Sequence, residues 1–320
     1  MVGVLDRRVD GCVRHVFDGS GYVLGRFECP PHAARWATVN WIGAQPHVVV
    51  PDTAVRLIPD GDVPYVSTVN HGLVYDRDVH FRRRLVSTDG DRCTFAIVSD
   101  DLAAELGIEH RQRRIRRPRL RYGSCDARAY AVLHQARAAL ADPAVDLLAV
   151  DEAVLSVLRH VADRVAAPVA PHTTGPRPAT ARARRQAVEQ IKAMLAADPS
   201  KPWTLAELAA VVHYSPYRLA RMFRAHTGYP IAGYRRQLVL RASLPDAVAR
   251  HSDLSSIAAA YGFSSHSHYT RMFRQVFGCT PSQAQAGLHV LTTYTTSPIA
   301  AESNSSVRPS PLTSPSPTAS

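Results

Sequence analysis

The chain has 320 residues, 46% of them hydrophobic, and a formal net charge of +11 at pH 7. This length and composition predict two domains or more with buried cores, and the positive charge indicates an anionic partner. No stretch approaches the roughly 20 apolar residues of a membrane span, and the N-terminus lacks the apolar segment of a secretory signal, so we expect a cytoplasmic protein without membrane segments.

Residues 1–120 contain short β segments divided by Pro, Gly and Asp. The runs 21–27, 47–50, 54–58 and 92–98 are β-branched or alternate between apolar and polar residues. Many short strands at close spacing predict a sandwich or a barrel. A barrel of this kind encloses a small molecule between apolar walls. Candidate lining residues are Trp36, Trp41, Tyr65 and Tyr75, with plain core packing as the alternative.

Neither the histidines nor the cysteines form a metal motif. Five histidines in this region are scattered without a His-x-His pair, namely His15, His32, His47, His71 and His80. We therefore expect no metal and no other cofactor. The cysteines lack a Cys-x-x-Cys pair, which indicates reduced structural thiols: Cys12, Cys29, Cys93, Cys125 and Cys279. A redox sensor would need two of them to meet in space.

A basic run and two predicted helices follow. The run consists of Arg111, Arg113, Arg114, Arg116, Arg117, Arg119 and Arg121. It either contacts DNA or the neighbouring domain, or it stays a solvated connector. Helices are predicted over 126–141 and 145–165, and the second has a broader apolar face than a lone helix can hide. Residues 167–183, rich in Pro, Ala and Thr, predict an extended linker.

The next segment contains one helical unit twice. Arg221-Met222-Phe223-Arg224 returns as Arg271-Met272-Phe273-Arg274, and a glycine follows each copy at the same distance. Thr204 and Glu207 have the spacing of a capping box, and Ser215-Pro216 predicts the start of a second helix. Asp253 and Ser264-Ser265 repeat this pattern. The sequence therefore predicts helix-turn-helix units at about 205–226 and 254–277.

The second helix of each unit combines an apolar stripe with a polar face. The polar faces carry Tyr217, Arg218, Arg221 and Arg224 in the first copy and His266, Ser267, Thr270, Arg271 and Arg274 in the second. An arginine fork pairs with guanine in the major groove or neutralises a phosphate. A solvated basic face is the alternative, and two copies in register make it the weaker one.

Residues 184–287 resemble the DNA-binding domain of the AraC/XylS family of bacterial transcription regulators. The strongest part runs from Ile257 to Ser265 and continues through 269–274 and 277–282. The resemblance implies two helix-turn-helix units on one monomer, joined by a long helix from Ile231 to about Ser243, with the two recognition helices in successive major grooves. It implies base contacts from Tyr217, Ala220, Arg221, His266, Ser267, Thr270 and Arg271.

Two positions depart from the family pattern. His213 stands in the first unit where the second has Gly262, at a turn that favours glycine if its φ is positive. Pro245 lies where the connecting helix would usually continue, so that helix either stops early or restarts at Pro245.

The resemblance also implies the organisation of the other segments, as an α+β protein. Residues 1–120 would form a cupin-like β-barrel sensor, and the helices of 121–166 would dimerise the protein or pack on that barrel. The charge follows the same division. Residues 182–285 carry 14 basic and 5 acidic side chains, whereas 1–181 carry 23 and 21. Residues 288–320 are rich in Ser, Thr and Pro and predict a disordered tail.

The sequence thus predicts a sequence-specific DNA-binding transcription regulator that is not an enzyme. Its predicted partners are double-stranded DNA, a small-molecule effector, RNA polymerase and a second copy of the chain. Two alternatives stay open: a nonspecific architectural DNA-binding protein, and a cupin-type enzyme fused to a DNA-binding domain. Against the second alternative, the sequence contains no recognisable catalytic motif.

Overall fold

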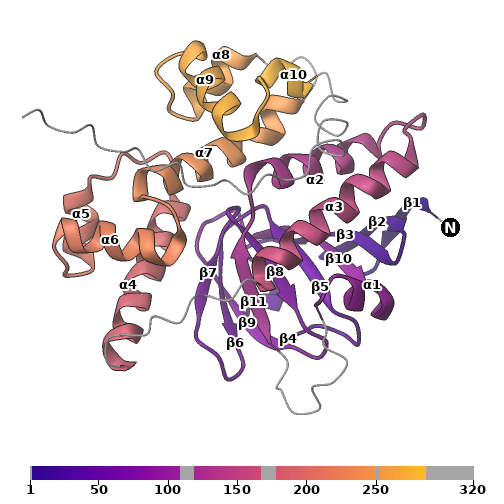
Figure 1. Cartoon of the computed structure of the whole chain (residues 1–320), viewed down its shortest axis with the longest axis horizontal. Helices are drawn as coiled ribbons and strands as arrows, with labels where there is room; N and C mark the ends of the chain where they lie inside the picture. Colours follow the sequence, from indigo (N-terminus) through magenta and orange to yellow (C-terminus); the bar gives the residue numbers. More distant parts are fainter. Residues whose placement is uncertain (1, 109–118, 167–177, 250–252, 286–320) are drawn as a thin grey trace, which may run out of the picture.

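The computed structural model describes residues 2–108, 119–166, 178–249 and 253–285 (Figure 1). The N-terminal part is built from β1 (Gly3–Arg8), β2 (Val13–Gly19), β3 (Tyr22–Cys29), β4 (Asn40–Trp41), β5 (His47–Pro51), β6 (Val55–Pro59), β7 (Tyr65–Ser67), β8 (His71–Tyr75), β9 (His80–Leu85), β10 (Asp91–Val98) and β11 (Leu120–Ser124). The four predicted strands correspond to β3, β5, β6 and β10.

The strands form two antiparallel sheets instead of one closed barrel. The larger sheet has the order β1-β2-β3-β10-β5-β8-β11, and the smaller has the order β4-β9-β6-β7. Within the described residues no strand of one sheet is hydrogen-bonded to the other. The edge strands β4 and β7 are two and three residues long, too short to carry the ladder across. The predicted barrel closure is therefore not found, and the sheets correspond to the sandwich alternative.

The candidate lining residues are not grouped around one cavity. Tyr65 and Tyr75 are buried in the apolar cluster between the sheets, with Trp36 partly buried against it. Trp41 is 59% exposed on the edge strand β4. Tyr65 and Tyr75 are therefore core residues, as the alternative interpretation had it, and Trp41 faces solvent instead of a barrel interior.

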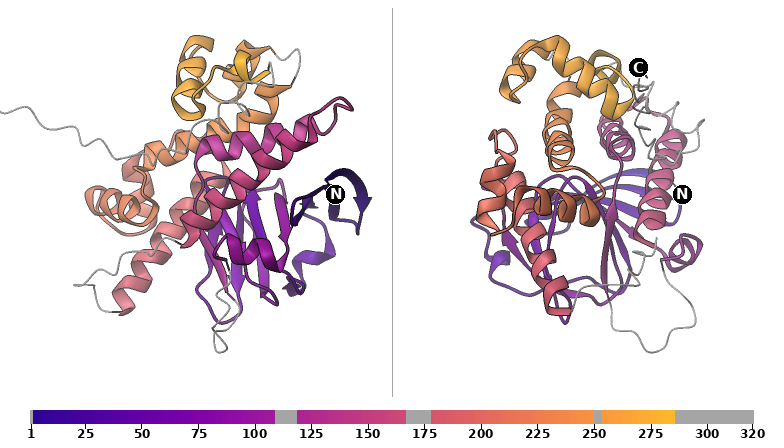
Figure 2. Two further views of the ribbon diagram at one scale, coloured as in Figure 1. Left: turned by 45° about the vertical axis from the view of Figure 1, so that its right-hand side comes forward. Right: turned by 60° about the vertical axis from the view of Figure 1, so that its left-hand side comes forward.

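Helices α2 (Ala127–Ala139) and α3 (Leu147–Ala166) lie across the larger sheet (Figure 2). The apolar face of α3 packs on β8 and β11. Two paired glycines permit this close approach, because a Cβ at Gly72 would lie 2.6 Å from Val161 and one at Gly123 would lie 2.6 Å from the Arg164 carbonyl oxygen. The broad apolar face of α3 is thus covered by the protein's own sheet. A short helix, α1 (Asp100–Glu105), precedes them.

The C-terminal part is entirely helical in the described residues. Its helices are α4 (Pro178–Ala197), α5 (Leu205–Val211), α6 (Pro216–Thr227), α7 (Ile231–Val248), α8 (Leu254–Ala260), α9 (His266–Phe277) and α10 (Pro281–Gln285). Residues 178–183 belong to α4 and not to the linker predicted for them, because Pro178 suits a first helical turn and the alanines and arginines that follow favour helix. No described helix is long and apolar enough to cross a membrane.

Several predictions fall outside the described residues. Most of the arginine run lies in 109–118, the middle of the linker in 167–177, and the whole tail in 286–320. Of the run, Arg119 and Arg121 are described: the Arg119 amide donates to the Asp76 carboxylate at 3.0 Å, and the Arg121 guanidinium pairs with it at 2.6 Å.

Candidate nucleic-acid interface

The first helix-turn-helix unit begins at the predicted capping box. The Thr204 hydroxyl accepts a hydrogen bond from the Glu207 amide at 3.2 Å, and the Glu207 carboxylate accepts one from the Thr204 amide at 2.7 Å. Ser215 caps α6 by accepting from the Arg218 amide, with Pro216 in the first turn. The local sequence therefore fixes where both helices of this unit begin.

The second unit repeats this geometry. The Asp253 carboxylate accepts from the amides of Ser255 and Ser256, which starts α8, and the Ser265 hydroxyl caps α9. Both recognition helices end on a left-handed glycine, Gly228 at φ 79° and Gly278 at φ 81°. The two-copy interpretation is confirmed at the level of caps, helices and ends.

The turn inside each unit has a positive φ, so the condition that the comparison of His213 with Gly262 left open is met. Gly262 has φ 75°, and His213 has φ 55°. A residue with a Cβ is disfavoured in this region, so His213 carries a small conformational cost that Gly262 does not.

Replacing His213 by glycine should therefore stabilise the protein by about 0.5–1 kcal/mol, less the entropy that a glycine adds to the unfolded chain. Urea denaturation followed by circular dichroism measures this change. Gly262→Ala is the matched control and should destabilise the second unit. A destabilised H213G variant would mean that the imidazole supplies an interaction that outweighs the backbone cost.

The first recognition helix, α6, separates core from surface as predicted. Leu219 and Phe223 are fully buried. Arg221 and Arg224 are exposed, and Ala220 is partly buried. Tyr217 is 77% exposed, and the guanidinium of Arg218 lies 5.1 Å from the ring centre of Tyr214. The structure thus presents the predicted side chains on one accessible face.

The second recognition helix, α9, borders a shallow groove of about 590 Å³. Its lining includes all five predicted residues and two that the sequence interpretation missed: His266, Ser267, Thr270, Arg271, Arg274, Gln275 and Thr280. The Thr270 hydroxyl lies 3.3 Å from Nε2 of His266. Hydroxyl, imidazole, amide and guanidinium groups together provide donors and acceptors for base edges and phosphates. Gln275 could have been predicted from the sequence, because it directly follows Arg274 of the repeated motif.

Helix α7 joins the two units, which lie at opposite ends of it (Figure 1). Its 18 residues span about 27 Å. The helix continues through Pro245, so the predicted stop or restart there was wrong. Leu244 and Ala247 beside it are buried, and their packing outweighs the hydrogen bond that a proline removes. Tyr261 donates to the Ala242 carbonyl and Asp246, which ties the second unit to α7.

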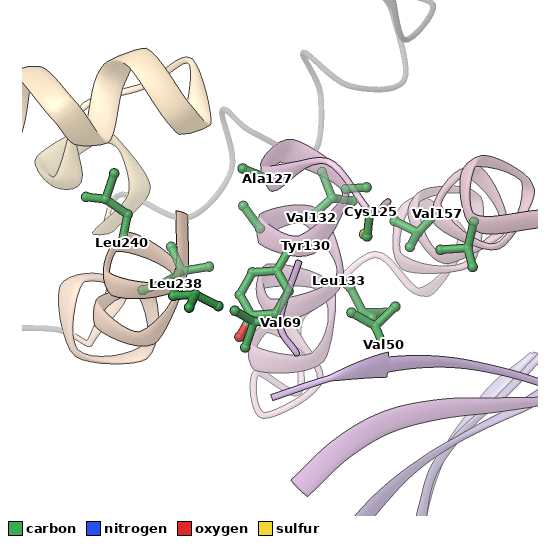
Figure 3. Close-up of a cluster of buried hydrophobic side chains, with 14 of the residues drawn as sticks. Val50, Val69, Cys125, Ala127, Tyr130, Val132, Leu133, Val157, Leu238 and Leu240 are labelled. Carbon is green, nitrogen blue, oxygen red and sulfur yellow. The ribbon is translucent and has the colours of Figure 1, made fainter. Parts of the chain in front are cut away.

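Helix α7 also fastens the helical part to the N-terminal domain. Arg241 is 1% exposed and donates to the carbonyl oxygens of Val69 and of Cys125, the latter at 2.7 Å. The hydroxyl of Tyr234 lies 2.8 Å from that of Thr68. Figure 3 shows the apolar side of this joint, where Tyr130 of α2 lies beside Val69 and Leu238.

Helix α4 adds a buried ion pair to the same joint. Lys192 donates to both carboxylate oxygens of Glu189 at 3.0 Å, and the two side chains are 1% and 2% exposed. The carboxylate also accepts from the Val66 amide of β7 and lies 3.3 Å from His226 of α6. Burial raises the pKa of Glu189, but Lys192, His226 and the Val66 amide outweigh it and hold this pKa at about 2.

A cleft of about 620 Å³ lies between the N-terminal domain and the helical part. Residues from β3, α2, α7 and the loops between strands line it, among them Arg26, Arg92, Tyr130, Arg137 and Arg241. Inside it, Asp52 pairs with His134 at 2.9 Å and with Arg137 at 3.3 Å. No group of three or more His, Cys, Asp or Glu side chains in the described residues is placed to hold a metal ion.

Comparisons with known proteins match the C-terminal part. Residues 208–287 match a family model described as a helix-turn-helix domain, of the AraC/XylS type. The regulatory protein Ada of Salmonella typhimurium is 32% identical over 111 residues, which cover 34% of this chain and 31% of that protein. The chain thus spans about a third of the length of this curated relative.

Two solved structures show weaker likeness. ToxT from Vibrio cholerae is 13% identical at a TM-score of 0.31, covering 85% of this chain and 97% of that one. An AraC-type regulator from Chromobacterium violaceum is 24% identical at a TM-score of 0.28, covering 34% of this chain and 95% of that one. The family match includes both recognition helices and the α7 connector between them. The part of the chain that these comparisons identify is thus a helix-turn-helix domain of the AraC/XylS type.

Proposed function

We propose that the protein is a sequence-specific DNA-binding transcription regulator that responds to a small-molecule effector. The observation that carries this proposal is a pair of helix-turn-helix units joined by one connecting helix. The recognition helix of each unit has a side-chain N-cap, ends on a left-handed glycine and exposes a face that bears arginines. Most of the excess positive charge of the chain lies on residues 182–285. Positive charge at this surface favours duplex DNA through release of counterions from phosphates.

The two recognition helices should read different bases. Around Arg221 the first helix offers Tyr217 and the methyl group of Ala220. The groove of the second offers His266, Ser267 and Thr270 around Arg271. Direct readout depends on the donor and acceptor pattern of each helix. The target of one monomer is therefore asymmetric.

The cleft between the N-terminal domain and α7 is the site that we propose for the effector, in place of a barrel interior. A molecule there would touch α2 and α7 at once and so change how the N-terminal domain holds the recognition helices. Arginines, carboxylates, two tyrosines and several apolar side chains line it, which suits a small polar molecule with an apolar part.

The other expected partners stay proposals. Because the apolar face of α3 is covered by the larger sheet, a dimer would need other surfaces of 121–166, such as the 62% exposed Leu148. Contact with RNA polymerase, a cytoplasmic location and the lack of enzymatic activity are proposed on the family relation alone.

The test is selection of target duplexes from a random library with the full chain, followed by competition at physiological salt. A regulator should bind its selected duplex about 10³-fold or more tightly than random duplex. An architectural protein should show little preference. Equal affinity for selected and random DNA would refute sequence-specific regulation.

A further inference from the structure

Two of the five cysteines lie next to each other at one end of the larger sheet. Asp10 shapes the turn between β1 and β2, because its carboxylate accepts hydrogen bonds from the amides of Cys12 at 2.6 Å and Val13 at 2.9 Å. The Cys12 carbonyl then accepts from the Glu28 amide at 2.8 Å. This bond places Cys12 directly beside the end of β3, where Cys29 is the last residue.

The two side chains enter the same apolar cluster. Cys29 is 1% exposed within the cluster between the sheets, and Cys12 packs against that cluster while keeping part of its surface in solvent. Their thiol groups are close enough to interact: burial, followed by the neighbouring Cys12 thiol, raises the pKa of Cys29 to about 11. The register of β2 and β3 pairs Val13 with Phe27, which places Cys12 opposite Glu28 and one residue from the position opposite Cys29. The two cysteines are thus diagonal neighbours on adjacent strands, and a disulfide accepts Cα separations of roughly 4.4–6.8 Å.

We propose that Cys12 and Cys29 form a redox modification site, a dithiol that hydroperoxides convert to a disulfide. The Cys12 thiolate attacks one oxygen of hydrogen peroxide, which yields a sulfenic acid and releases hydroxide. The Cys29 sulfur then attacks the sulfenic sulfur and gives up its proton. The sulfenic hydroxyl leaves with that proton as water. Two electrons pass from the two sulfurs to the peroxide, and a dithiol reductant reverses the reaction.

The order of the two steps follows from exposure. Only the thiolate reacts rapidly with peroxide, and a solvent-accessible sulfur meets it first. Cys12 is the accessible member, whereas Cys29 is buried and its raised pKa keeps it protonated at neutral pH. Cys12 is therefore the peroxidatic residue and Cys29 the resolving one.

A disulfide at this location would affect the strand that borders the cleft between the N-terminal domain and α7. Arg26 and Glu28 precede Cys29 on β3 and line the cleft between the N-terminal domain and α7. A disulfide at the end of β3 would tie this strand to the β1–β2 turn.

The experiment is treatment of the purified full chain with a small excess of hydrogen peroxide, followed by alkylation and peptide mass spectrometry. Titratable thiols should fall from five to three, with one peptide pair linked through Cys12 and Cys29 and released by dithiothreitol. Cys12→Ser and Cys29→Ser should each abolish the linkage. Cys125→Ser and Cys279→Ser are matched controls and should keep it.

Cys93 is the structural competitor, because it lies opposite Phe27 on β10, one strand from Cys29. Retention of the Cys12–Cys29 linkage in Cys93→Ser supports the pairing, and a Cys29–Cys93 linkage overturns it. Over-oxidation of Cys12 without any linkage also overturns it. Circular dichroism of each variant establishes that it is folded, and loss of the linkage in denaturant shows that the native fold directs the pairing.

Discussion

Replacing Arg271 by alanine is expected to weaken binding to a selected target duplex by about 1–3 kcal/mol, roughly 5- to 150-fold. Arg271 is exposed and lines the α9 groove together with His266, Thr270 and Gln275. A bidentate pair with one base would be lost entirely with the guanidinium. Fluorescence anisotropy with the selected duplex and with variants at each base measures the loss and its position.

The controls separate base recognition from phosphate contact. Arg274→Ala should weaken binding to all duplexes alike and lower the slope of log affinity against log salt by about one. Arg221→Ala should relax specificity at a different base from Arg271→Ala, since the two lie on different recognition helices. If both R221A and R271A bound the selected duplex as tightly as the parent chain, the assignment of recognition faces would fail.

The C-terminal part could be predicted closely because its signals are local. A capping box needs only Thr204 and Glu207, and a left-handed helix end needs only Gly228 or Gly278. The duplication added a second copy of the caps and of the glycine end, with Asp253 in place of the capping box. Even the conformational cost at His213 was visible as a mismatch with Gly262. The five missed residues of α7 beyond Ser243 are the exception, since they depend on burial of Leu244 and Ala247.

The N-terminal part was harder because its strands depend on distant partners. Strand β9 carries Arg82, Arg83 and Arg84, and its charge conceals a strand whose Arg83 is buried against Asp91 at 2.9 Å. Strand β8 includes Gly72, which suggests a turn until α3 is seen to pack on it. Neither fact follows from spacing or composition. Separation of the sheets, and hence the absence of barrel closure, depends on such contacts.

The joint between the two parts was not predicted at all. Arg241, Tyr234 and Glu189 belong to helices that the sequence assigned to DNA binding alone, yet each of them bonds residues 66–70 of the N-terminal domain or their neighbours. A buried arginine and an exposed arginine look the same in a helical pattern. Only the fold distinguishes the cations that fasten the domains from those that face solvent.

Replacing Glu189 by glutamine should lower the free energy of unfolding by about 3–5 kcal/mol, because it leaves the buried Lys192 without its counter-charge. The amide still accepts from Val66 and keeps the shape of the side chain, so the loss is electrostatic. Urea denaturation at neutral pH measures it. Glu105→Gln is the matched control: its pair with Arg159 is exposed and should contribute about 0–1 kcal/mol.

The pH dependence identifies the same carboxylate. The pKa of Glu189 is lowered in the folded chain from 4.5 to about 2, so its contribution is complete above pH of about 4.5 and is lost as the pH falls towards 2. The parent chain should therefore lose stability through this window, and Glu189→Gln should lose less. An unchanged pH profile in the variant would contradict the assignment.

The double variant Glu189→Gln, Lys192→Met shows what the two charges contribute to the joint, because glutamine keeps an acceptor for the Val66 amide. If it recovers most of the lost stability, the two charges do not stabilise the fold in net terms, since uncharged residues of similar size do as well. Their effect then lies elsewhere. Two charges that are costly to bury lower the free energy needed to separate α4 from β7, because separation returns both to water. The joined arrangement would still be the favoured one and would hold the recognition helices in place. The free-energy difference between the joined and the separated arrangement would be small, so an effector in the adjoining cleft could change which one is favoured. In that case the double variant should hold the helices more firmly and respond less to any molecule that binds there.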